Sequence, residues 1–314
     1  MLSHRVFTNL LKEVNRVVGE NLLAVSIYGD ACTRNDFIPG ISEIDVVIVT
    51  REIIDDLCFV NEQLNKSCAQ LFNSQINFHV IPDELFKTFY IEGIYPAVLA
   101  VCSNCYLYNE KYFRELRKVE YKNDRLAINY SLCSGLYRIS KAIEYLTQRN
   151  YKCVIRNLYY SAKLSLSALI HKKLRKLPIC NDEITSALNR IRNCGDIRRA
   201  YADILEACKS SGEANAKHHR HYTTIHDQES VLRISDRIKA MEFYFRRSYL
   251  INRRCWELIY GEDFLNFDEF LDLLEVRSPV DIELLCLDDE PVAIFYVGRE
   301  EEERIKLFKK RKVK

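Results

Sequence analysis

Two short runs of apolar, mostly β-branched residues, 23–27 and 46–49, flank a polar segment that contains two glycines and a proline. This pattern predicts a strand, a loop and a second strand. Residues 75–82 alternate polar with apolar positions and end at a proline, which predicts a third, half-buried strand. We therefore expect the first third of the chain to contain a small sheet.

Two carboxylates stand where the second strand begins. Glu43 and Asp45 are separated by one residue, and on a strand residues i and i+2 point to the same face. We expect these two side chains to project together, while Ile44 and Val46 face the opposite layer. Paired hard oxygen ligands suit Mg²⁺, which proteins usually hold by one or two carboxylates together with substrate phosphates. The pair therefore predicts a divalent-metal site.

The same segment resembles a family signature. It is similar to the pattern G-S-x-A-R-G-x-F-x-P-G-x-S-D-I-D of minimal nucleotidyltransferases of the polymerase-β-like superfamily, at Gly29, Arg34, Phe37, Pro39, Gly40 and residues 42–45. The resemblance implies a nucleotidyltransferase that moves a nucleoside monophosphate from a nucleoside triphosphate to a hydroxyl acceptor. It also implies Mg²⁺ or Mn²⁺ on Glu43 and Asp45, and nucleotide contacts from Gly29, Asp30, Arg34 and Ser42.

The segment departs from the signature at three places. The loop between Gly29 and Arg34 is one residue longer, Asp30 stands where the family has Ser, and Asn35 stands where it has Gly. A serine hydroxyl can donate a hydrogen bond to a phosphate, whereas an ionised aspartate only accepts. Asp30 therefore either binds the metal as a further ligand or weakens nucleotide binding. Asn35 is the milder change, because Asn tolerates a left-handed backbone.

The third strand carries a further departure. In the resembling family a strand at this point brings a third carboxylate that helps to activate the attacking hydroxyl, and here Asn77 holds that catalytic position. Asn offers only a neutral carbonyl oxygen, which is a poor base. His79 lies two residues further on and points the same way. His79 is then either a general base or a polar residue on the exposed face of an edge strand.

Helical periodicity surrounds these strands. It predicts helices within residues 1–20 and 53–72, a short helix from residue 83, and a further helix or strand within residues 97–108. We expect a first domain at residues 1–115, built as a small mixed sheet with helices on one side.

From about residue 121 the hydrophobic positions recur with helical spacing over long stretches, and strand patterns are absent there. Helices are predicted at residues 126–146 and 151–173, joined as a hairpin, and then at residues 181–191, 196–208 and 228–260, with a loop at residues 210–212. Residues 154–162 resemble the second helix of HEPN-type helical domains, which commonly accompany minimal nucleotidyltransferases. We expect this helical domain to span residues 120–260.

Basic residues gather at two places in the helical part. Arg220, His221 and His226 fit the loose spacing of HEPN ribonucleases, in which His226 would be an acid or base and Arg220 would stabilise a phosphate. The alternatives are a phosphate-facing loop that closes the nucleotide cleft, or a solvated loop. The long last helix also has an arginine-rich face, which either meets an anionic substrate or is solvated.

The last segment, residues 261–314, differs in composition. It predicts a short acidic helix at residues 264–274, strands at residues 280–287 and 292–297, and a charged end at residues 299–314 that is helical or frayed. The basic tail at residues 309–314 is expected to be a flexible solvated end, and the alternative is a nucleic-acid arm.

Composition narrows the partners and the compartment. The chain is 48% hydrophobic and 29% charged with a formal net charge of +2, so it has no overall field that attracts nucleic acid. No apolar window long enough to cross a membrane and no signal-peptide pattern is present, so we expect a cytoplasmic protein without membrane contact. Its twelve cysteines are scattered through apolar segments and predict reduced thiols. Cys102 and Cys105 are the one close pair, and a zinc site there lacks two evident ligands.

These patterns give one fold class and three functional hypotheses. The fold is α/β plus all-α: a polymerase-β-like mixed-sheet domain followed by a helical bundle. The leading hypothesis is a nucleotidyltransferase whose hydroxyl acceptor is a small molecule, a tRNA end or a protein. The alternatives are a catalytically degenerate nucleotide-binding regulatory protein and a fused antitoxin and toxin of nucleotidyltransferase and HEPN type. A homodimer stays open.

Overall fold

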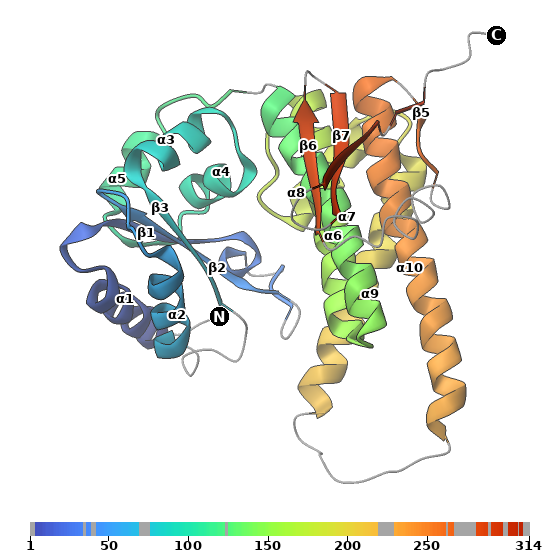
Figure 1. Ribbon diagram of the computed structural model, residues 1–314, viewed down its shortest axis with the longest axis horizontal. Helices are drawn as coiled ribbons and strands as arrows, with labels where there is room; N and C mark the ends of the chain where they lie inside the picture. Colours follow the sequence, from blue (N-terminus) through green and yellow to red (C-terminus); the bar gives the residue numbers. More distant parts are fainter. Residues whose placement is uncertain are drawn as a thin grey trace. The chain divides into compact units, whose positions relative to one another are not determined.

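The computed structural model describes residues 4–33, 36–38, 42–68, 76–122, 125–218, 229–261, 263–266, 281–287, 290–297, 301–306 and 308–309. The chain divides into two compact units. Unit 1 consists of Met1–Asp124 and Ile179–Glu183, and unit 2 of Arg125–Pro178 and Ile184–Lys314. Unit 1 contains a mixed sheet with helices, and unit 2 is mostly helical (Figure 1). The predicted fold class, α/β plus all-α, is confirmed.

The sheet of unit 1 has four strands in the order β3-β2-β1-β4. β1 runs antiparallel to both β2 and β4, whereas β2 and β3 are parallel. The three strands expected from the sequence are confirmed, and the fourth lies in the region left open between helix and strand. The bounds are β1 Leu22–Tyr28, β2 Ile44–Thr50, β3 Ile76–Pro82 and β4 Tyr106–Tyr108.

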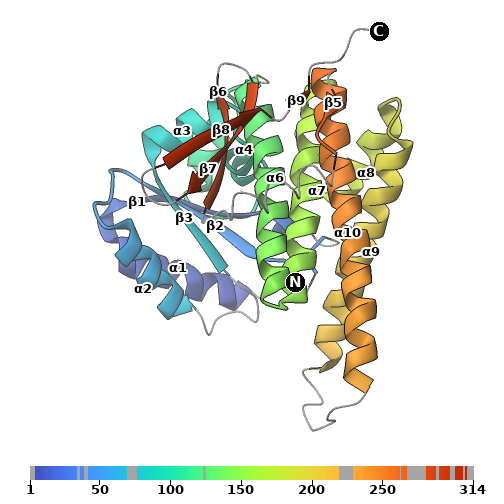
Figure 2. The same ribbon diagram turned by 45° about the vertical axis from the view of Figure 1, so that its right-hand side comes forward.

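Helices cover both faces of this sheet, so the expectation of helices on one side is wrong (Figures 1 and 2). Val25, Ile27 and Val46 face a core shared with α1 (His4–Val18) and α2 (Leu57–Cys68). On the other face, Ser26 donates a hydrogen bond of 3.0 Å from its hydroxyl to the carbonyl of Ala100 in α4 (Tyr95–Cys102). The reason is that β1 and β2 are buried along almost their whole length, which requires cover on both faces. The remaining helices of unit 1 are α3 Asp83–Ile91 and α5 Glu110–Leu116.

Five helices form most of the described part of unit 2: α6 Arg125–Thr147, α7 Tyr151–Leu174, α8 Asn181–Arg190, α9 Gly195–His218 and α10 Glu229–Tyr260. α6 and α7 lie side by side (Figures 1 and 2), and the Asn150 side chain caps α7 by accepting a hydrogen bond of 3.2 Å from the Cys153 N–H. The first turn of α8 belongs to unit 1. The loop expected at residues 210–212 is wrong, because α9 continues through it into a stretch of good helix formers.

A buried polar contact fixes how closely α6, α7 and α10 approach. The Asn252 side-chain amide donates to the Ser165 hydroxyl at 2.7 Å, and both residues are completely buried. A Cβ atom at Gly135 would lie 2.5 Å from that hydroxyl oxygen. Gly135 is therefore required by the close approach of these helices and not by its backbone angles.

The end of the chain contains β6 Asp281–Leu287, β7 Glu290–Val297 and β8 Glu301–Lys306 as an antiparallel three-stranded sheet, and β5 Asp263–Phe264 paired with β9 Phe308–Lys309. The predicted strands at residues 280–287 and 292–297 are confirmed. The helical or frayed end is wrong at residues 301–306 and 308–309, because pairing of β8 with β7 and of β9 with β5 overrides the weak strand preference of a charged segment. The acidic helix expected at residues 264–274 is wrong at its start, because Phe264 pairs in β5. Residues 267–274 and the end of the basic tail lie outside the described residues.

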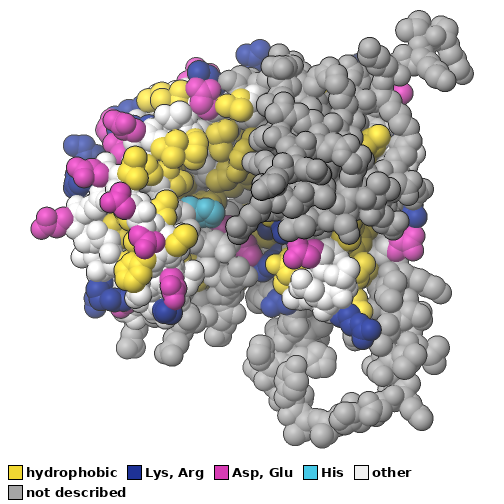
Figure 3. Space-filling model, in the orientation of Figure 1, with side chains coloured by type: hydrophobic (Ala, Val, Ile, Leu, Met, Phe, Trp, Pro, Cys, Tyr) yellow, Lys and Arg dark blue, Asp and Glu magenta, His cyan; other side chains and the backbone are white. Residues whose placement is uncertain are grey.

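Within the described residues, no single helix is long and apolar enough to cross a membrane, and α3 with α4 meets that test only as a pair bent by 98°. Unit 1 exposes several large hydrophobic side chains, among them Ile53, Phe59 and Leu85. Figure 3 shows hydrophobic side chains gathered on one face of this unit.

Candidate functional site

The carboxylates of Glu43 and Asp45 converge on a single nitrogen atom. The side-chain amide of Asn77 donates to Glu43 Oε2 at 2.6 Å and to Asp45 Oδ1 at 3.2 Å. Glu43 is 5% exposed, and the Asp45 side chain is 20% exposed. Two carboxylates on one face, as the strand period predicts, therefore meet around a donor group whose hydrogens carry partial positive charge.

The strand register produces this arrangement. Asp45 pairs with Asn77 across the parallel strands β2 and β3, and with Tyr28 across the antiparallel strands β1 and β2. Directly opposed residues project to the same face of a sheet. Ile44 and Val46 project to the other face and enter the core with α1 and α2. Burial of Ile44 and Val46 thus fixes the register of β2, and this register places Asp45 beside Asn77.

His79 also reaches this cluster. Its Nε2 atom lies 3.8 Å from Asp45 Oδ1, and its ring centroid lies 5.8 Å from that of Tyr28. The His79 side chain is 44% exposed. His79 is thus both partly open to solvent and adjacent to the carboxylates, and among the described residues it is the imidazole beside the pair.

A hydrogen bond joins Asp30 and Ser42, which lie near the two ends of the loop between β1 and β2. The Ser42 hydroxyl donates to Asp30 Oδ2 at 3.1 Å and accepts from the Ile38 N–H at 3.0 Å. Both Asp30 and Ser42 are 2% exposed. A buried carboxylate needs such donors, because an unsatisfied charge away from water is costly. The Asp30 carboxylate therefore links the turn after β1 to Ser42, directly before the Glu43 and Asp45 pair.

The donor set of the pair fits a small divalent cation. Two carboxylate oxygens point at one place, and rotation of the Asn77 amide by half a turn would present its oxygen there as a third hard ligand. Within the described residues, no group of three or more His, Cys, Asp or Glu side chains is placed to hold a metal. Asp30, whose carboxylate accepts a hydrogen bond from Ser42, stays a predicted further ligand.

Gly29 stands between the loop and the carboxylates. Its φ is +75°, a left-handed conformation that glycine adopts without strain, and a Cβ atom there would lie 3.3 Å from Asp45 Oδ2. The structure thus brings together Gly29, Asp45, Glu43 and Asn77. Arg34, Asn35, Pro39 and Gly40 lie outside the described residues.

The sequence analysis missed Asp36 as part of the loop. Asp36 is 3% exposed, and its Oδ2 accepts a hydrogen bond of 2.9 Å from the backbone N–H of Asn181, at the start of α8. A carboxylate at a helix N-terminus satisfies a free N–H and meets the positive end of the helix dipole. The only sequence signal was the helix start at residues 181–183, and nothing in it identified the partner 145 residues away.

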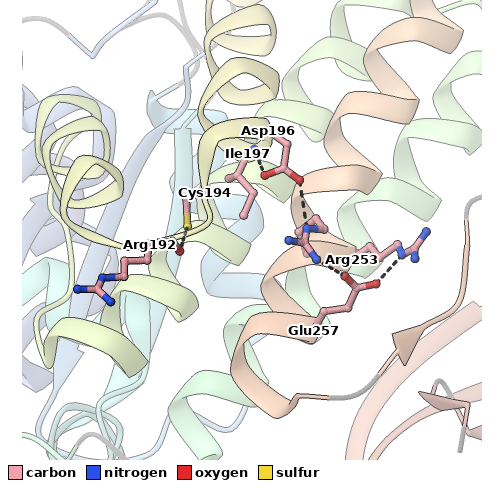
Figure 4. A network of polar contacts seen from close by, with 7 residues as sticks. Arg192, Cys194, Asp196, Ile197, Arg253 and Glu257 are labelled. Atoms are coloured by element: carbon pink, nitrogen blue, oxygen red, sulfur yellow. Dashed lines mark hydrogen bonds and ion pairs between the residues drawn. The ribbon is translucent and has the colours of Figure 1, made fainter. Parts of the chain in front are cut away.

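In the part of α10 whose side chains the structure describes, four arginines of the arginine-rich face pair with acidic side chains. The Arg254 guanidinium contacts Asp196 at 3.1 Å and Glu257 at 2.7 Å, and Glu257 also pairs with Arg253 (Figure 4). The hydrogen bond to Glu257, followed by the charge of Asp196, raises the pKa of Arg254. Two more pairs are Arg246 with Glu242 and Arg247 with Asp203. These four arginines are thus engaged within unit 2, while Arg220, His221 and His226 lie outside the described residues.

Comparisons with known proteins give structural matches and no sequence match. No family model matches the chain, and no curated protein matches it. A spectinomycin adenyltransferase from Enterococcus faecialis, determined with ATP and spectinomycin, is similar with a TM-score of 0.45 and 10% identity, over 79% of this chain and 99% of that chain. A nucleotidyltransferase-like protein from Exiguobacterium sibiricum 255-15 is similar with a TM-score of 0.28 and 10% identity, over 90% of this chain and 95% of that one. At this level of similarity neither match carries an argument about the site.

Proposed function

We propose that the chain is a nucleotidyltransferase that transfers a nucleoside monophosphate from a nucleoside triphosphate to a hydroxyl acceptor, with pyrophosphate leaving. The observation that carries the proposal is the convergence of Glu43 and Asp45 on one point beside the Gly29 turn, η2 (Gly29–Cys32). Carboxylate oxygens that converge in this way are the ligands of Mg²⁺ in phosphoryl-transfer sites.

Each residue of the site has a defined part in this proposal. Glu43 and Asp45 would hold Mg²⁺ or Mn²⁺, which neutralises triphosphate charge and orients it for in-line attack when it is bound there. Gly29 lets the backbone approach the phosphates without a side chain in the way. Ser42, through its hydrogen bonds to Asp30 and Ile38, would fix the position of these two residues beside the start of β2.

The acceptor hydroxyl must lose a proton during the transfer. The Asn77 amide cannot take that proton, because it has no basic lone pair. His79, 3.8 Å from Asp45 and partly exposed, is the side chain that we assign to this role. The class of acceptor is a small molecule, a tRNA end or a protein hydroxyl.

A second function is favoured by one specific observation. The Asn77 amide donates to both carboxylates, and its hydrogens offset part of their negative charge. A protein that binds nucleotide for regulation, without transfer, would tolerate such a site. Dependence of nucleotide binding on a divalent metal distinguishes the two functions.

Calorimetric titration of ATP tests the proposal. In Mg²⁺ the wild type should bind ATP, and EDTA or Asp45→Asn should remove most of that affinity, because the triphosphate then meets the site without its counter-ion. Asp55→Asn is the matched control, since Asp55 is an exposed acid outside the cluster. Equal ATP affinity in Asp45→Asn and wild type would contradict the assignment, and ATP binding that ignores EDTA would favour the regulatory function.

A further inference from the structure

Two cysteines that are far apart in the sequence meet beside the Gly29 turn. Cys32 ends this turn, η2 (Gly29–Cys32), and Cys105 directly precedes β4. The Cys32 thiol lies 3.1 Å from the carbonyl oxygen of Ile27, and the Ile27 N–H donates to the Cys105 carbonyl at 3.0 Å. The side chains of Cys32 and Cys105 also lie close enough to shift each other's pKa, which is raised for Cys32 and lowered for Cys105. Ile27 of β1 thus contacts both cysteines, the side chain of Cys32 and the backbone of Cys105.

The surroundings favour reaction at Cys105. Both side chains are only partly buried, so a small reagent can reach the pair. The hydrogen bond from Cys32 lowers the pKa of Cys105, whereas burial raises the pKa of Cys102, three residues earlier. The thiolate is the nucleophilic form of cysteine. Cys102 and Cys105, which are close in sequence, therefore differ in the direction of their pKa shifts. The side chain that lowers the pKa of Cys105 is that of Cys32.

We propose that Cys32 and Cys105 are a redox modification site, which a peroxide converts to a disulfide and a dithiol reductant restores. The inference that this disulfide weakens nucleotide binding rests on the proposed function of the neighbouring site. The formation of the bond itself does not.

The reaction balances with a peroxide as the oxidant. The Cys105 sulfur attacks one oxygen of hydrogen peroxide, the O–O bond breaks, and the released hydroxide takes a proton to become water. The sulfenic acid on Cys105 is then attacked by the Cys32 sulfur, the S–O bond breaks, and the oxygen leaves as a second water with the thiol proton. The two cysteines lose two electrons in total, and the peroxide gains them.

The new bond would move the Gly29 turn. A disulfide holds its sulfur atoms about 2.05 Å apart, which is much closer than two hydrogen-bonded sulfurs lie. Cys32 must therefore shift toward Cys105 and give up its contact with the Ile27 carbonyl. Asp30 and Gly29 belong to the same turn, and Gly29 lies against Asp45. We expect the affinity for ATP with Mg²⁺ to fall by about tenfold, since displacements of about 1 Å near a reacting group are strongly felt.

Peptide mapping tests the disulfide directly on the full-length chain. Trypsin cleaves after Lys and Arg, so Cys32 falls in the peptide 17–34 and Cys105 in the peptide 88–111, together with Cys102. After treatment with hydrogen peroxide, mass spectrometry should find these two peptides joined with the loss of two hydrogens. Cys102→Ser should keep the joined species, and Cys105→Ser and Cys32→Ser should lose it. Absence of the joined species from the wild type, or its loss in Cys102→Ser, would overturn the proposal.

ATP titrations before and after peroxide test the consequence. The oxidised wild type should bind about tenfold more weakly, dithiothreitol should restore the affinity, and Cys105→Ser and Cys105→Ala should be insensitive to peroxide. A joined species that leaves the ATP affinity unchanged would overturn the regulatory part of the inference. If the reduced wild type binds no ATP, the proposed function fails, and peptide mapping still decides whether the pair is a modification site.

Discussion

A methyl group added to Gly29 would lie 3.3 Å from Oδ2 of Asp45, while the φ of Gly29 is +75°. We therefore predict two effects of Gly29→Ala. The left-handed backbone should cost about 1–2 kcal/mol of unfolding free energy, and the displaced Asp45 carboxylate should weaken metal-dependent ATP binding. Chemical denaturation and calorimetry measure the two effects separately.

Gly19→Ala is the matched control for this variant. Gly19 has a φ of +63°, and a Cβ atom there would meet nothing within 4 Å. It should lose a similar amount of stability and keep the ATP affinity of the wild type. If Gly29→Ala binds ATP as well as Gly19→Ala does, the close approach of Gly29 to Asp45 has no role in the site.

Asn77→Asp should convert the site into one with three carboxylates. Without metal the three negative charges repel one another and the hydrogen bonds of the amide are lost, so unfolding free energy should fall by about 1–3 kcal/mol. With Mg²⁺ the added charge should raise metal affinity by about tenfold or more. Thermal unfolding with and without Mg²⁺ measures both. Asn77→Ala removes the amide without adding charge, and equal Mg²⁺ responses in the two variants would argue against a metal at this place.

The strand period predicted which side chains share the Glu43 face, because burial of Ile44 and Val46 leaves no other choice. It could not predict that Asn77 bridges the two carboxylates, since this contact depends on the register between β2 and β3. The expectation of helices on one side failed because apolar residues on both faces of β1 and β2 were interpreted only as strand-forming.

The sequence did not predict which side chains meet, either within the loop between β1 and β2 or between distant segments. Asp30 was interpreted as a metal ligand or a repulsive charge, and its partner is a serine in the same loop. Spacing singled out Cys102 and Cys105, whereas the structure brings Cys32 and Cys105 together at Ile27. Such pairings follow from the packing of the chain, which no local pattern records.

The hydrogen bond between Ser42 and Asp30 should appear as a coupling energy. A double-mutant cycle with Ser42→Ala and Asp30→Ala should give about 1–3 kcal/mol, because the bond is buried and its acceptor is a carboxylate. Urea denaturation supplies the four free energies. Thr33→Ala is the control, since its hydroxyl donates to the backbone carbonyl of Asp30. Coupling of Asp30→Ala with Thr33→Ala as large as with Ser42→Ala would contradict the assignment.

Unit 1 should lose stability at alkaline pH through Tyr90. Burial raises the pKa of Tyr90 from 10.0 to about 12, and its hydroxyl donates to the Val119 carbonyl. The unfolded chain then loses this proton before the folded chain does. The free energy of unfolding should therefore be unaffected by Tyr90 below about pH 10 and fall by about 1–2 kcal/mol between pH 10 and 12.

Tyr90→Phe isolates this effect, because the phenyl ring keeps the packing and cannot ionise. Its unfolding free energy, measured in urea across the same pH range, should fall less steeply than that of the wild type. Parallel pH profiles for the two proteins would show that Tyr90 does not titrate later in the folded state.

Mass spectrometry of reaction products tests the central claim most directly. The wild type is incubated with each nucleoside triphosphate, Mg²⁺ or Mn²⁺, and a cell extract that supplies small molecules, tRNA and proteins. We predict a product heavier by one nucleoside monophosphate together with pyrophosphate, formed also by Asp55→Asn and not by Asp45→Asn. A wild type that forms no such product with any nucleotide, or an Asp45→Asn variant that forms it equally well, would contradict nucleotidyl transfer at the Glu43 and Asp45 pair.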